Sequence, residues 1–161
     1  MIFLSACRTI NTKTEIIHNI VDFNGYKKYI EEQKDVLLLV NFWATWCKPC
    51  VEELPYFIKA NQTYQNKDFK ILFVSLDRAA DFETRVLPFA QQKKMQTDLL
   101  LLNDVKNMNT WISAINPNWT GAIPATILYQ NGKQIYFHEG QLSEKELNQL
   151  INKFYKMKKV Q

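Results

Sequence analysis

The sequence predicts an α/β fold in which helices flank a central mixed β-sheet on both faces. Stretches typical of strands alternate with stretches typical of helices, and a hairpin followed by a helix closes the chain. The chain has 161 residues, of which 47% are hydrophobic, so it can form one domain with a proper core. With four glycines and five prolines, it is not a low-complexity chain.

The first half of the chain is expected to supply strands and helices in alternation. A short strand over 15–22 precedes a polar helix over 26–33. The stretch 36–44 is apolar almost throughout, as expected for a central strand that is covered on both faces. A long helix over 47–65 and a buried strand over 70–76 follow.

The second half is expected to complete the sheet. Asn131-Gly132 is a strong signal for a two-residue hairpin turn. Ser143 opens the last helix, because Glu146 completes a capping box, and this helix runs towards Met157. The remaining expected elements are a helix over 80–94 and strands over 98–102, 125–130 and 134–138.

The most informative feature is Trp46-Cys47-Lys48-Pro49-Cys50, directly after the central apolar strand. A Cys-x-x-Cys pair between a strand and a helix indicates a dithiol–disulfide redox device. At the helix N-cap, the sulfur of Cys47 lies beside unpaired N–H groups and the positive end of the helix dipole, which favour the nucleophilic thiolate. Pro49 suits the first turn because it has no N–H to satisfy. Cys50 is close enough to attack a mixed disulfide formed at Cys47.

The same spacing also occurs in zinc sites and structural disulfides. A zinc site needs two further ligands, and the chain offers only Cys7, His18 and His138, none of them in a paired motif. A purely structural disulfide is disfavoured because so short a loop constrains the unfolded chain little. We therefore expect catalytic redox chemistry and no metal.

The segment 41–50 (NFWATWCKPC), with Glu53 and Pro55 in the following helix, resembles the active site of the thioredoxin superfamily. More narrowly, it resembles the TlpA/ResA-like thiol–disulfide oxidoreductases of bacterial cell envelopes. Ile123-Pro124 falls where the superfamily carries its cis-proline loop. Asn41 replaces the buried aspartate usual in thioredoxins proper, which favours the TlpA/ResA-like branch. This whole-domain resemblance implies a thioredoxin fold.

The resemblance also implies a role for each matching residue. Cys47 would be the exposed attacking thiol and Cys50 the resolving one. Pro124, if cis, would lie beside the sulfurs and let the backbone of Ile123 pair with an extended substrate segment; the alternative is a trans residue that starts a strand. Glu53 would accept the proton of the resolving thiol; the alternative is that it only favours the first turns of the helix.

Three further features around the motif support or extend this interpretation. Lys48 adds positive charge near Cys47 and so favours its thiolate. Trp46 is expected on the rim of the site and Trp43 in the core. The segment 104–121 is longer than a minimal thioredoxin needs; we expect it to form an extra core-capping helix, and the alternative is that it shapes the substrate groove.

The function implied is that of a protein-disulfide reductase acting on disulfide-bearing envelope proteins, in apocytochrome c maturation or general disulfide repair. A membrane-embedded thiol donor would restore the dithiol, and no cofactor is expected besides the Cys47–Cys50 disulfide. The direction of transfer is a thermodynamic matter, so a disulfide-donating oxidant on the same fold remains an alternative.

Three alternatives belong to other classes. A peroxidase of the peroxiredoxin type is disfavoured, because it requires a threonine where this chain has Ala44, three residues before Cys47. A copper-handling protein on the same fold would prefer Cys-x-x-x-Cys with a distal histidine, a role left to His138. A non-catalytic binding module would keep its role after the substitution Cys47→Ser.

The N-terminal segment 1–13 is expected to be a leader or the remnant of a lipoprotein signal, and 14–161 the thioredoxin-like domain. Leu4-Ser5-Ala6-Cys7 resembles a lipobox, so Cys7 is a candidate for lipidation; the alternative is a stray thiol in a disordered leader. We therefore expect the periplasmic side of a bacterial cell envelope, with membrane contact only through a lipid anchor. The C-terminal lysines indicate a solvated helix end, and no nucleic-acid partner is expected.

Overall fold

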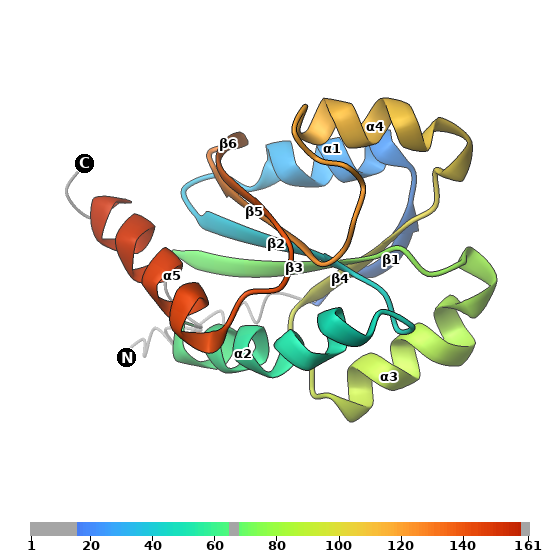
Figure 1. The fold of residues 1–161 in the computed structure, drawn as a ribbon, viewed down its shortest axis with the longest axis horizontal. Helices are drawn as coiled ribbons and strands as arrows, with labels where there is room; N and C mark the ends of the chain where they lie inside the picture. Colours follow the sequence, from blue (N-terminus) through green and yellow to red (C-terminus); the bar gives the residue numbers. More distant parts are fainter. Residues whose placement is uncertain (1–15, 65–67, 159–161) are drawn as a thin grey trace, which may run out of the picture.

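The computed structural model describes residues 16–64 and 68–158, which form one mixed six-stranded β-sheet between two layers of helices (Figure 1). The strand order across the sheet is β1-β4-β3-β2-β5-β6. The strands are β1 (His18–Val21), β2 (Leu37–Trp43), β3 (Phe69–Ser75), β4 (Asp98–Leu102), β5 (Ala125–Gln130) and β6 (Lys133–Glu139).

The sheet is mixed because some neighbouring strands run parallel and others antiparallel. Strands β1 to β4 pair in parallel, whereas β5 pairs antiparallel with β2 and with β6. In the register of β2 with β5, Phe42 lies opposite Ala125, so the end of β2 lies beside the beginning of β5. This pairing brings two segments that are distant in sequence to the same end of the sheet.

The helices cover both faces, as the sequence predicts (Figure 1). Helices α1 and α4 lie on one face, and α2, α3 and α5 lie on the other. Their bounds are α1 (Phe23–Glu32), α2 (Lys48–Tyr64), α3 (Leu87–Gln92), α4 (Met108–Ile115) and α5 (Glu144–Lys158).

Each face of the sheet has its own hydrophobic core. Phe57 of α2 and Phe73 of β3 are fully buried on the face that carries the cysteines. Phe42 of β2 packs on Trp119 across the other face, with ring centroids 4.8 Å apart. Every residue of β2 is buried, which is why its sequence is apolar without alternation. The strand that precedes the cysteines is therefore held rigidly from both sides.

The expected helix over 80–94 is divided in the structure. A short 3₁₀ segment (Ala79–Asp81) and a π-helical segment (Phe82–Val86) precede α3. Pro88 is the second residue of α3 and has no N–H to donate to the carbonyl one turn back. The change of helical type occurs directly before this proline, and Pro88 occupies the first turn of α3, where a proline is tolerated.

Two other elements refine the expectations. Helix α1 begins earlier than expected, because the Asp22 carboxylate accepts a hydrogen bond from the N–H of Gly25 at 2.8 Å and caps the helix. The segment 104–121 forms a 3₁₀ turn (Val105–Asn107) and α4, which buries Trp111 against the sheet. The extra helix thus covers the core, as expected.

Candidate active site

The two cysteines of the motif form a disulfide at the beginning of α2, with their Cα atoms 5.3 Å apart. Helix α2 begins at Lys48, so Cys47 is the residue immediately before it, and its carbonyl accepts a hydrogen bond from Val51 N at 3.0 Å. Pro49 is the second helical residue, where its missing N–H leaves no hydrogen bond unmade. The sulfur of Cys47 is therefore attached to a residue at the positive end of the helix dipole.

The two sulfurs differ in access. The exposed fraction is 6% for Cys47 and 0% for Cys50, whereas Trp46 beside them is 65% exposed. Cys47 is less exposed than the resemblance implies, although it is still the more accessible of the two cysteines. Trp46 lies on the rim, and Trp43 is fully buried.

The second part of the site comes from the segment before β5. The peptide bond between Ile123 and Pro124 is cis, the form expected from the resemblance. The carbonyl oxygen of Ile123 lies 3.7 Å from Cys47 Sγ. The N–H of Gly140, just past β6, donates to the Pro124 carbonyl at 2.8 Å and ties this segment to the neighbouring strand. The antiparallel pairing of β2 with β5 thus brings Ile123 and Cys47 together.

Glu53 is a fully buried carboxyl group one turn along α2 from Cys50. Its Oε1 accepts a hydrogen bond from Asn41 Nδ2 at 2.8 Å, and its Oε2 accepts one from the N–H of Leu142 at 2.7 Å. Burial raises the pKa of Glu53 from 4.5 to about 7, and the two hydrogen bonds oppose that rise. A group with this pKa can take up and release a proton near neutral pH.

The charge of Lys48 has little effect on the Cys47 sulfur. Its side chain is 87% exposed, and its ammonium lies 3.9 Å from the carboxylate of Glu52. An exposed lysine beside an acidic partner stabilises a neighbouring thiolate little. In the dithiol form, stabilisation of a Cys47 thiolate is therefore expected from the helix dipole and the first-turn N–H groups.

Two residues of the site were not anticipated from the sequence. Asp77, just after β3, accepts hydrogen bonds from the backbone N–H of Thr45 at 2.9 Å and from its hydroxyl at 2.6 Å. Thr45 belongs to the turn that leads from β2 into Cys47. The only sequence signal was an acidic residue at the end of a buried strand, which does not reveal its partner.

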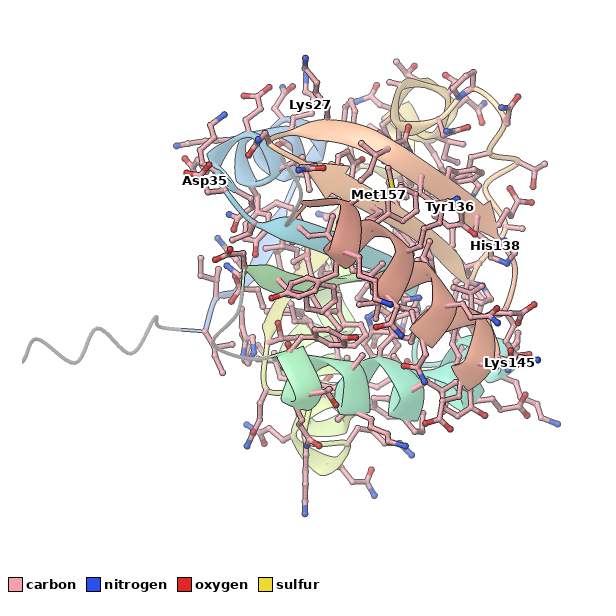
Figure 2. The ribbon with its side chains drawn as sticks, turned by 90° about the vertical axis from the view of Figure 1, so that its left-hand side faces the viewer. Lys27, Asp35, Tyr136, His138, Lys145 and Met157 are labelled. Carbon is pink, nitrogen blue, oxygen red and sulfur yellow. A yellow bond between two sulfur atoms is a disulfide. The ribbon has the colours of Figure 1, made fainter. Side chains whose placement is uncertain are left out.

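His138 lies in a groove between β6 and α5. Figure 2 shows Tyr136 and His138 on β6 beside that helix. Leu142 and Glu146 also line the groove, which has a volume of about 330 Å³.

Within residues 16–64 and 68–158, no group of three or more histidine, cysteine, aspartate or glutamate side chains is arranged to hold a metal ion. None of the described helices has the length and apolarity needed to cross a bilayer.

The fold and the site together define a thiol–disulfide oxidoreductase built on the thioredoxin fold. The chain belongs to the AhpC/TSA family, whose model matches residues 15–138. It is 30% identical over 130 residues to the thioredoxin-like protein YneN of Bacillus subtilis. The matched region covers 80% of this chain and 71% of that protein. It is 25% identical over 135 residues to the thiol-disulfide oxidoreductase ResA of Bacillus cereus, covering 83% of this chain and 72% of that one.

The fold is also found in solved structures. The solution structure of a thiol:disulfide interchange protein from Bacteroides sp. has a TM-score of 0.62 to this chain at 24% identity, covering 77% of this chain and 76% of that one. These comparisons confirm the predicted superfamily and the oxidoreductase class.

Proposed function

We propose that this chain reduces disulfides of envelope proteins by exchange through Cys47 and Cys50. The observation that carries the proposal is the asymmetry of the pair. Cys47 lies immediately before α2 and keeps a small exposed fraction of 6%, whereas Cys50, inside the helix, is completely buried. Such a pair suits one thiol to attack a partner protein and the other to attack only the intermediate.

The exchange has two steps. In the dithiol form, the Cys47 thiolate attacks one sulfur of a substrate disulfide, forming a mixed disulfide and releasing the other substrate sulfur as a thiolate that takes up a proton. Cys50 then loses its proton and attacks the Cys47 sulfur, which releases the second substrate sulfur as a thiolate that also takes up a proton. The substrate gains two electrons and two protons, and the chain is left with the Cys47–Cys50 disulfide.

Glu53 is the group we assign to the proton of Cys50. It is buried on the same helix, three residues further on, and its pKa of about 7 lets it accept a proton at neutral pH. We assign Ile123 to substrate binding, because its backbone lies next to Cys47 and can pair with an extended segment of the substrate. Trp46, which is largely exposed, adds apolar surface for that segment.

The reducing direction is supported by the resemblance to reducing envelope oxidoreductases and by the small contribution that the charge of Lys48 makes to the Cys47 thiolate. Strong oxidants of this type are those whose reduced form is stabilised. Here the ammonium of Lys48 is exposed and lies beside Glu52, so it contributes little to that stabilisation. A membrane-embedded thiol donor would then restore the dithiol after each turnover. Apocytochrome c is a candidate substrate within this proposal.

The location in the envelope rests on the resemblance to envelope oxidoreductases and on the lipobox-like segment before Cys7. Segment 1–13 and Cys7 lie outside the described residues, so a lipid anchor at Cys7 remains part of the proposal. Metabolic labelling of the full chain with a radioactive fatty acid tests it. Cys7→Ser should abolish the label, whereas Cys47→Ser should retain it.

The reduction potential of the Cys47–Cys50 pair is the first test of this function. We would equilibrate the protein against graded thiol–disulfide buffers in a Cys7→Ser background, so that only this pair reacts. A value near about −270 mV or lower supports a reductase, and a value near about −120 mV means a disulfide-donating oxidant. Absence of a reversible couple would refute exchange altogether, and Cys47→Ser serves as the inactive control.

A further inference from the structure

Asp77 is a buried acidic residue, 5% exposed, that forms no ion pair with any residue the structure describes. Its carboxylate accepts hydrogen bonds from the N–H and hydroxyl of Thr45 and, at 2.8 Å, from the hydroxyl of Ser75. All three donors face the two oxygens of one carboxylate, which is an acceptor-only group when ionised.

These hydrogen bonds hold the turn that carries Cys47. Thr45 lies two residues before Cys47, between the end of β2 and the beginning of α2. The N–H of Cys47 donates to the carbonyl of Ala44 at 3.1 Å, and the N–H of Leu76 donates to the carbonyl of Trp43 at 2.8 Å. The residues just after β3 therefore hold the chain at Trp43, through Leu76, and at Thr45, through Asp77. Asp77 supplies the attachment nearest to the cysteine.

The turn sets the directions of two neighbouring side chains. Trp46 is 65% exposed, whereas Cys47 is 6% exposed and lies before the first turn of α2. Without a fixed Thr45, this turn has no other side-chain hydrogen bond in the described residues to hold it. The sulfur of Cys47 then spends less time beside the first-turn N–H groups, which stabilise its thiolate.

We propose that Asp77 is a positioning residue, which holds Cys47 at the beginning of α2 through Thr45. This inference rests on the proposed disulfide exchange. Asp77 does not touch the substrate or the sulfurs; it acts on them by fixing the turn. Loss of the attachment should slow attack by Cys47 and raise the pKa of its thiol towards the ordinary value of about 8.5.

Two neutral substitutions separate the geometry from the charge. In Asp77→Asn, the amide oxygen can accept from Thr45 N and from Ser75, and the amide nitrogen can donate to the Thr45 hydroxyl, so the turn stays attached. Asp77→Ala removes every side-chain bond. Because both variants lack the negative charge, a difference between them reports the attachment alone. Asp81→Ala is the matched control, since Asp81 lies in the same segment and its side chain binds Arg78 rather than the turn that carries Cys47.

The experiment measures the second-order rate constant for reduction of a model protein disulfide, and the pKa of the Cys47 thiol from its alkylation rate against pH. Asp77→Ala should be about tenfold to a hundredfold slower than Asp77→Asn, as expected when a reacting group is misplaced. Its Cys47 thiol should also have the higher pKa. Asp81→Ala should match the parent in both quantities.

Equal rates and equal thiol pKa values in Asp77→Ala and Asp77→Asn would overturn the proposal. If Asp77→Ala does not fold, Thr45→Val decides the matter, because it removes one hydrogen bond and keeps the shape. A loss of rate in Thr45→Val that Thr45→Ser restores supports the proposal, and no loss contradicts it. If the parent protein itself fails to exchange disulfides, the proposed function fails, and that result is distinct from either outcome here.

Discussion

Replacing Glu53 by glutamine should make the stability of the oxidised protein less dependent on pH. Glu53 is fully buried, and burial raises its pKa from 4.5 to about 7. Between these values the folded protein keeps a proton that the unfolded chain has lost. The stabilising contribution is therefore complete below pH 4.5, declines as the pH rises, and is fully lost above about pH 7. Glutamine does not titrate, so the variant does not lose this stability as the pH rises.

The magnitude follows from the two pKa values. At about 1.4 kcal/mol for each pH unit, the full change is about 3 kcal/mol, and about 2 to 3 kcal/mol of it falls between pH 5 and pH 8. The substitution should be tolerated, because Asn41 Oδ1 has no hydrogen-bond partner among the described residues. If the Asn41 amide turns over, that oxygen accepts from the new amide group, while Leu142 still donates to the glutamine oxygen.

The assay is urea unfolding of the oxidised forms at pH 5 and pH 8 in a Cys7→Ser background, in which no thiol titrates. The free energy of unfolding of Glu53→Gln relative to the parent should increase by about 2 to 3 kcal/mol from the lower to the higher pH. Glu52→Gln, at the adjacent and half-exposed position, should show no comparable trend. A constant difference between Glu53→Gln and the parent across this range would refute the assigned pKa and the proton role built on it.

Three further outcomes are expected. Cys50→Ser should accumulate a mixed disulfide between Cys47 and a substrate protein, seen as a reducible adduct on a non-reducing gel; absence of the adduct would contradict the assigned order of attack. Lys70→Met should destabilise the fold by about 3 kcal/mol in urea unfolding, because it leaves the carboxylate of Asp98, 2.7 Å away, buried without its cation; an unchanged free energy of unfolding would contradict this. Trp46→Ala should raise KM for a protein substrate while changing stability by no more than about 0.5 kcal/mol, since its side chain is 65% exposed; an unchanged KM would remove it from the substrate surface.

The parts of the structure that the sequence predicts best are determined locally. The apolar stretch before the cysteines forms a strand because both of its faces are covered, and the Cys-x-x-Cys pair begins a helix that accommodates Pro49. Strands 98–102 and 125–130 have the predicted bounds. Hairpin and capping-box signals likewise act over a few residues, so a single sequence is enough to recognise them.

The features that were missed depend on contacts between distant segments. Asp77 and Thr45 are 32 residues apart, and Glu53 and Leu142 are 89 residues apart. No local pattern of residues predicts such pairs. The division of the helix expected over 80–94 lies in the pattern of backbone hydrogen bonds before Pro88, which hydrophobic periodicity does not register.

The antiparallel pairing of β5 with β2 also has a consequence for biosynthesis. The two cysteines are translated long before Ile123, which faces Cys47, and before Leu142, which binds Glu53. While the chain is still being made, β2 has no β5 beside it and Glu53 lacks its backbone donor. The reactive pair therefore exists first without the surroundings that we expect to control it. Only when β5, β6 and the beginning of α5 have been added can the site acquire its specificity.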